Sequence, residues 1–118
     1  MSVRVGTAFV PVTDPVAAAQ WYVDTFGLRA VSVSEWSANL AGEQPGATLT
    51  LMGPRSGIHA EPGLPFCTHN LVVDDLEAAR QGLADAGLAL GGVEGDPGIC
   101  LYFTLRDPDG NLLLVCDR

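Results

Sequence analysis

The chain has 118 residues, of which 47% are hydrophobic and 17% are charged, and this is enough apolar material for the core of one compact domain. Six basic residues stand against 14 acidic ones, so the formal net charge is −8 with histidine neutral. This balance argues against nucleic acid as a partner, because such binding depends on neutralising phosphates. No stretch is apolar over the roughly 20 residues that cross a bilayer, and Met1–Gly6 lacks the features of a signal peptide. We expect a cytoplasmic protein with no membrane partner.

The first predicted element is a strand over Val3–Val12, and a helix follows it from Pro15. The Asp14 carboxylate can cap this helix, and proline is well tolerated in a first helical turn. Gly27 can end the helix with a left-handed backbone. Apolar residues at helical spacing predict a buried stripe that consists of Val16, Ala19, Val23 and Phe26.

Three more strands complete the first half, at Leu28–Ser34, Trp36–Ala41 and Ala47–Met52. The following segment, Gly53–Pro65, contains three prolines and three glycines and reads as a loop. Thirteen residues is long for a structureless connection in a compact domain, and such loops are often functional. We interpret it as a mobile lid.

The second half repeats the first at a spacing of 61 residues, which places Thr7 on Thr68 and Asp14 on Asp75. This repeat predicts a strand, a helix and three strands once more. The helix has a stripe of Leu76, Ala79, Leu83 and Ala86. The predicted strands are Phe66–Val73, Leu88–Val93, Ile99–Leu105 and Leu112–Cys116, with a tight turn at Asp107–Asn111.

Three cysteines, Cys67, Cys100 and Cys116, lie in apolar runs typical of strands. They are odd in number and lie 33 and 16 residues apart, which matches neither a disulfide framework nor a zinc motif. We expect them to be buried thiols.

Together these motifs resemble the vicinal oxygen chelate superfamily, which contains glyoxalase I, extradiol dioxygenases and the bleomycin resistance proteins. The resemblance covers nearly the whole chain and rests on an ordered set of segments, Val12–Asp14, Trp21–Tyr22, Phe26–Leu28, Val73–Ala78 and Arg106–Asn111. It implies an α+β fold of two βαβββ modules, about residues 1–53 and 66–118, joined in a single domain by loop 53–65. The curved mixed sheets of such modules form a cup, commonly completed by a second chain in a homodimer.

Metal enzymes of this superfamily hold their ion with four inward-facing histidine or carboxylate side chains. Aligning the motifs places these positions at Thr7, Thr50, Thr68 and Leu114. Neutral hydroxyls and a leucine cannot replace imidazole and carboxylate at a transition metal. His69 should face the helix side of its sheet, because neighbouring strand residues point to opposite faces, unless a one-residue bulge turns it inward. We therefore expect no metal, no cofactor and no catalytic residue carried over from the enzymes.

A cup without a metal can still bind a small molecule, because its expected lining is apolar with scattered hydrogen-bonding groups. The predicted ligand-binding residues are Thr7, Phe9, Trp36, Thr50, Met52, Thr68, Asn70, Tyr102, Thr104 and Leu114. The favoured function is sequestration of an aromatic or cationic natural product, which would confer antibiotic resistance of the bleomycin-resistance type. One alternative is a lyase, isomerase or dioxygenase-like enzyme with an unusual or absent metal site, using Asn70, Tyr102 or Glu35 for proton transfer. Another is a structural or regulatory dimer whose cup is filled by its own side chains.

Overall fold

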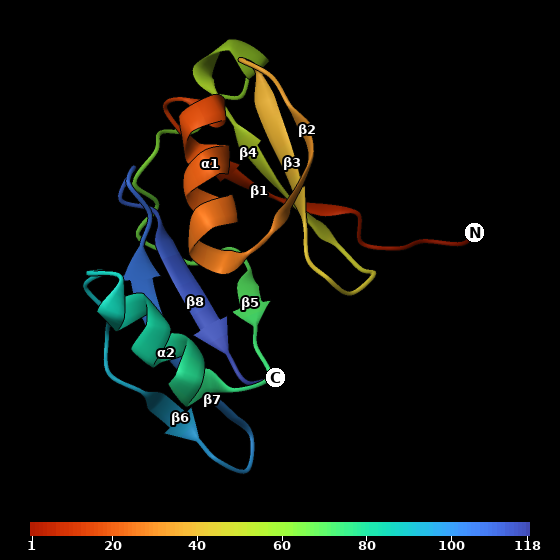
Figure 1. Ribbon diagram of the computed structural model, residues 1–118. Helices are drawn as coiled ribbons and strands as arrows, with labels where there is room; N and C mark the ends of the chain where they lie inside the picture. The colour runs from red at the N-terminus through yellow and green to blue at the C-terminus, as the bar shows by residue number, and fades with distance from the viewer. The chain divides into compact units, whose positions relative to one another are not determined.

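The computed structural model describes residues 1–118. They form two compact units, unit 1 from Met1 to Gly63 and unit 2 from Leu64 to Arg118. Each unit contains one helix and one four-stranded mixed sheet (Figure 1). The predicted α+β class and the repeated βαβββ order are confirmed. No helix is both long enough and apolar enough to cross a membrane.

In unit 1 the first and last strands lie side by side and parallel, in the sheet order β1-β4-β3-β2. A parallel pair cannot be closed by a tight turn and needs a crossover, which here includes the helix. The helix covers one face of the sheet (Figure 1). The elements are β1 (Thr7–Pro11), α1 (Pro15–Phe26), β2 (Arg29–Val33), β3 (Ser37–Ala41) and β4 (Thr48–Met52), followed by a 3-10 turn at Pro54–Ser56.

Both predicted ends of α1 are confirmed. The Asp14 carboxylate accepts hydrogen bonds from the amides of Val16 and Ala17 at 3.0 and 3.3 Å, which satisfies amide groups that have no partner inside the helix. Gly27 ends the helix with φ of 70°, a conformation that costs glycine little.

The predicted buried stripe of α1 is partly wrong, because Val16 is 53% exposed and Val23 and Phe26 are only half-buried. The helix is apolar on nearly every side, so periodicity alone does not select the face that meets the sheet. Small alanines and one fully buried aromatic ring make this contact, and the buried residues are Pro15, Ala18, Ala19 and Tyr22. The sheet contributes Val10, Ala38, Leu40, Leu49 and Leu51 to the same core, and burying each large aliphatic side chain contributes about 1.5–3 kcal/mol.

Unit 2 has the same topology, with sheet order β5-β8-β7-β6 and a parallel β5–β8 pair. Asp75 caps its helix by accepting a hydrogen bond from the Ala78 amide at 3.0 Å. Leu76 and Leu83 are buried, but Ala86 lies past the last helical residue and is exposed, so that part of the predicted stripe is wrong. The elements are β5 (Asn70–Val72), α2 (Leu76–Asp85), β6 (Glu94–Asp96), β7 (Cys100–Arg106) and β8 (Leu112–Cys116).

The strand predicted at Phe66–Val73 is shorter than expected, because β5 starts only at Asn70. In the parallel register Asn70 lies opposite Leu114, so Thr68 would lie opposite Leu112. The Leu112 amide instead donates to the Leu64 carbonyl at 2.9 Å. Leu64 therefore occupies the edge that Thr68 needs for strand pairing.

The strand predicted at Leu88–Val93 is wrong, and β6 forms three residues later, at Glu94–Asp96. Only one backbone bond joins this stretch to β7, from the Gly91 amide to the Thr104 carbonyl at 2.8 Å. A Cβ at Gly91 would lie 2.9 Å from Thr104 Oγ1, so the close approach requires glycine. Two glycines in sequence there weaken a strand, because they add backbone entropy and no side-chain packing.

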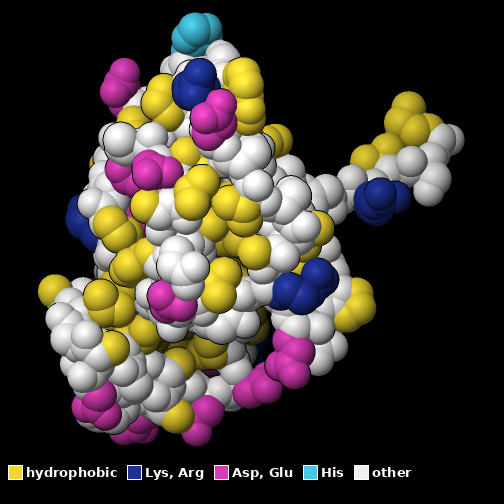
Figure 2. All heavy atoms as spheres, turned by 45° about the horizontal axis from the view of Figure 1, so that its top comes forward, with side chains coloured by type: hydrophobic (Ala, Val, Ile, Leu, Met, Phe, Trp, Pro, Cys, Tyr) yellow, Lys and Arg dark blue, Asp and Glu magenta, His cyan; other side chains and the backbone are white.

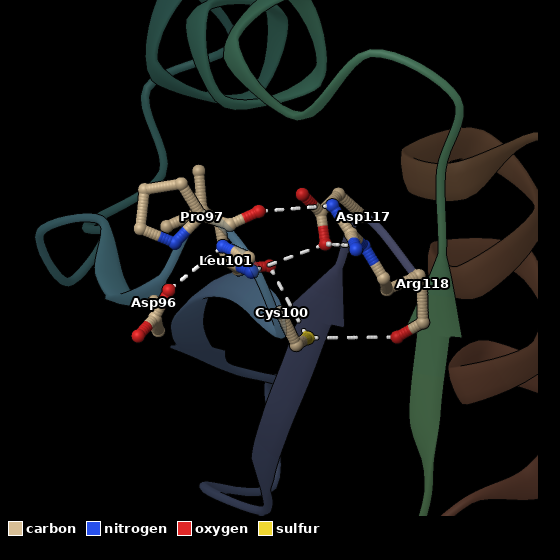
Figure 3. A network of polar contacts seen from close by, with 7 residues as sticks. Asp96, Pro97, Cys100, Leu101, Asp117 and Arg118 are labelled. Carbon is tan, nitrogen blue, oxygen red and sulfur yellow. Dashed lines mark hydrogen bonds and ion pairs between the residues drawn. The ribbon is translucent and has the colours of Figure 1, made fainter.

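A polar network holds the end of β8 against the β6–β7 turn (Figure 3). The Leu101 amide donates to the Asp117 carboxylate at 3.0 Å, and the Arg118 guanidinium donates to the Pro97 carbonyl at 3.0 Å. The Cys100 thiol donates weakly to the Arg118 carbonyl, with sulfur and oxygen 3.5 Å apart. Cys100 thus has a structural role in this network.

Gly53, which follows β4, leaves no space for a side chain. A Cβ there would lie 2.6 Å from Pro15 Cγ and 3.4 Å from the Trp36 carbonyl oxygen. We predict that Gly53→Ala lowers the free energy of unfolding by about 1–3 kcal/mol through this clash. Gly42→Ala is the matched control, because no atom lies within 4 Å of its new Cβ. Urea denaturation that gives the same midpoint for both variants would contradict the packing.

Candidate ligand-binding site

Four polar side chains meet on the face of the unit 1 sheet that α1 does not cover. This polar cluster comprises Thr7 of β1, Thr48 and Thr50 of β4, and Asn39 of β3. The hydroxyl oxygens of Thr7 and Thr50 lie 2.7 Å apart, and Asn39 Nδ2 donates to Thr48 Oγ1 at 2.8 Å and to Thr50 Oγ1 at 2.9 Å. All four side chains are half-buried, so the cluster is accessible to a ligand while its members hold each other in place.

The hydrogen-bond directions in the polar cluster follow from the number of protons each group has. Thr7 donates its one hydroxyl proton to the Thr48 carbonyl at 2.9 Å, so the proton shared by the two hydroxyls comes from Thr50. Both amide protons of Asn39 are used by Thr48 and Thr50. The Thr48 hydroxyl proton and the Asn39 carbonyl oxygen remain to serve a ligand.

Apolar side chains border the polar cluster along the same two strands. Phe9 lies opposite Thr50 in the β1–β4 register and is 50% exposed. Two residues further along β4, Met52 is half-buried. The sheet face therefore joins hydrogen-bonding groups to a flat aromatic ring, a combination that suits small organic molecules.

Trp36, which was also predicted for this site, immediately precedes β3 and lies outside the strand. The Arg55 guanidinium lies 5.5 Å from the centre of the Trp36 ring and forms an ion pair with Glu35 at 2.9 Å. Trp36 is still 52% exposed, but the Arg55 guanidinium occupies one face of its ring.

The predicted site residues of unit 2 lie on the uncovered face of its own sheet. Asn70, Leu114 and Thr104 face one another across β5, β8 and β7, and Tyr102 pairs with Cys116. Thr68 is outside the sheet and exposed, so it does not join this row.

The thiols of this surface do not form a reactive site. Cys116 is 2% exposed, and burial raises the pKa of its thiol, an effect that the neighbouring Asn70 amide opposes in part. A raised pKa keeps the thiol protonated and unreactive. Cys67 and Cys100 are half-buried, and all three cysteines are free thiols.

Residues that follow β4 form a cleft in unit 1 with a volume of about 470 Å³. Its lining includes Val12, Met52 and Ile58 together with the ionisable side chains of His59 and Glu61. Figure 2 shows a histidine that projects from the surface, with acidic, basic and apolar side chains close to it. The sequence pointed to this loop by its length, but it did not indicate a cleft.

Sequence and structural comparisons agree on the family. The model of the Glyoxalase/Bleomycin resistance protein/Dioxygenase superfamily matches residues 4–115. The chain belongs to this superfamily. No curated protein matches the sequence.

Several solved structures share the fold over nearly the whole chain. A superfamily member from Sphaerobacter thermophilus is 22% identical, with a TM-score of 0.82 and 98% of each chain covered. TnmS3, an antibiotic binding protein from Streptomyces sp. CB03234, is 25% identical, with a TM-score of 0.76, and covers 98% of this chain and 96% of its own. A glyoxalase/bleomycin resistance protein from the same strain is also 25% identical, has a TM-score of 0.76 and covers 94% of this chain and 97% of its own.

The side chains that the sequence motifs align with the superfamily's metal positions do not fit a transition metal. In unit 1 the positions are Thr7 and Thr50, whose neutral hydroxyls are hydrogen-bonded to each other. In unit 2 they are Thr68, which lies outside the sheet, and Leu114, which has no donor atom. No group of three or more His, Cys, Asp or Glu side chains comes together elsewhere to hold an ion.

His69, next to one of these positions, is unusual because its ring is half-buried and its Nε2 has no hydrogen-bond partner. Its Nδ1 lies 3.3 Å from Thr68 Oγ1. Burial lowers the pKa of His69 below its usual value of 6.5, because the charged imidazolium loses solvation. The native state therefore favours neutral imidazole.

This shift predicts a pH dependence of stability. The unfolded chain binds the His69 proton at a higher pH than the native chain, so stability is greatest above about pH 6.5 and falls as the pH is lowered towards 5. In His69→Gln the thermal midpoint should lose this part of its pH dependence, whereas the control His59→Gln, at an exposed position, should keep it. Equal pH profiles for the two variants would contradict the assignment.

Proposed function

We propose that this protein binds and sequesters a small, flat natural product, neutral or cationic, without a metal and without catalysis, in the manner of the bleomycin resistance proteins. The observation that carries the proposal is the direct 2.7 Å contact between the Thr7 and Thr50 hydroxyls. The superfamily's metal enzymes need strong donors at these positions, whereas here two neutral groups satisfy each other. A polar cluster of this kind can hydrogen-bond a ligand but cannot act as a Lewis acid.

The composition of the proposed site favours neutral or cationic ligands. Its members Thr7, Phe9, Thr50 and Met52 have no formal charge. A buried carboxylate or phosphate would find no positive group to offset its lost hydration. The antibiotic binding activity named for TnmS3, which is 25% identical, supports a natural product as the ligand and resistance as the biological role.

The enzyme alternative needs an acid–base pair placed on a reacting atom. Of its candidates, Glu35 is engaged by Arg55 at 2.9 Å, and Asn70 lies against the protonated Cys116 thiol. Neither arrangement favours proton transfer. Chemical conversion of a bound ligand, detected by mass spectrometry of the ligand after incubation, would overturn the proposal in favour of the enzyme.

The proposal predicts that Phe9 is the aromatic anchor. Phe9→Ala should weaken the binding of a planar aromatic ligand by about 1–2 kcal/mol, because stacking and burial on the ring are lost. The control is Val16→Ala, which removes an equally exposed apolar side chain from the outer surface of α1, where Val16 is 53% exposed. Affinities come from quenching of tryptophan fluorescence by a panel of neutral, cationic and anionic planar natural products. A panel from which only anions bind, or a Phe9→Ala variant that binds like wild type, would refute this assignment.

We further propose a homodimer, because exposed apolar side chains would remain in contact with water in a single chain. All five residues of edge strand β2 are exposed, and they include Val31 and Val33 at 52% and 44%. Native mass spectrometry of the purified protein should give about twice the 12.3 kDa chain mass, with no zinc, iron, nickel or manganese. A monomer, or one metal ion per subunit, would contradict the proposal.

A further inference from the structure

The cleft of unit 1 has the volume of a small-molecule pocket. Its volume of about 470 Å³ lies within the range of roughly 300–1,000 Å³ that is usual for ligand sites. Val12 at its base is 1% exposed, and its amide donates to the Met52 carbonyl at 3.0 Å. Ile58, which is half-buried, adds apolar surface from the following loop.

The wall of the cleft that contains Pro54 is held in place before any ligand arrives. The Ser56 hydroxyl donates to the Gly53 carbonyl at 2.6 Å, and the Gly53 amide donates to the Trp36 carbonyl at 3.0 Å. The Arg55 side chain contacts both the Glu35 carboxylate and the Trp36 ring. A wall with this much internal bonding loses little entropy on binding.

The cleft has one acidic lining residue, Glu61, and no arginine contributes to the lining. Its other ionisable lining residue is His59. The Glu61 carboxylate is exposed and takes part in neither of the ion pairs of the chain. The formal net charge of −8 adds a field that attracts cations.

From this geometry we propose that the cleft is a cation subsite, in which the flat apolar part of a ligand lies on Met52 and Ile58 and its positive group pairs with Glu61. The inference rests on the proposed function, because Met52 belongs both to the sheet-face site and to the cleft. It adds a charge preference and a specificity-determining residue, Glu61.

The test uses 9-aminoacridine, a flat tricyclic cation at neutral pH, and anthracene-9-carboxylate, a tricyclic anion of similar size. Binding to the full chain is followed by the fluorescence anisotropy of each dye. Glu61→Gln should lower the affinity for 9-aminoacridine roughly two- to fivefold, which is the effect of losing a solvent-accessible ion pair. The matched control is Glu43→Gln, which makes the same change of net charge at another exposed glutamate outside the cleft lining.

Two further readouts separate the cleft from a general field effect. Added salt should weaken 9-aminoacridine binding more in wild type than in Glu61→Gln, and backbone amide signals of residues 58–61 should shift on titration. Equal affinities of Glu61→Gln and Glu43→Gln would overturn the subsite. If 9-aminoacridine still binds and Phe9→Ala weakens it, only the subsite fails. If no planar ligand binds at all, the proposed function fails with it.

Discussion

The parallel pairing of the first and last strands is the constraint on which each module depends. β1 pairs with β4 and β5 pairs with β8, and neither pair can be joined by a hairpin. The intervening chain must therefore cross over, and its helix covers one sheet face. The opposite face of the sheet presents the side chains of every second residue of each strand. In unit 1 these residues include the polar cluster, so the topology that closes the core also exposes the candidate site.

The two modules share this topology, but the side chains at corresponding positions differ in their chemistry. Thr50 of β4 and Leu114 of β8 occupy corresponding places opposite the first strand, yet one joins a hydrogen-bonded cluster and the other is apolar. Unit 2 has a buried thiol, Cys116, and the Asn70 amide beside it. This chain has neutral groups that suit hydrogen bonding and stacking.

Most of the fold could be predicted from local patterns, and the errors occurred where distant segments compete. β8 formed over the residues predicted for it, because apolar residues and a glycine-containing turn define it locally. β5 is shorter than predicted at its N-terminal end because the Leu112 amide donates its hydrogen bond to the Leu64 carbonyl. These two residues lie 48 positions apart in the sequence. β6 forms later in the chain than predicted because Gly91 lies close to Thr104. Neither contact leaves a periodic signal in the sequence.

The sequence by itself determined the repeat, the capped helix starts at Asp14 and Asp75, and the membership of the superfamily. These features depend on residues close together in the chain and on motif order. Only the tertiary structure decided which face of α1 is buried, that Asn39 joins Thr7 and Thr50, and that the Arg55 guanidinium lies over the Trp36 ring. Each of these depends on strand register and on packing between distant segments, which composition and spacing do not specify.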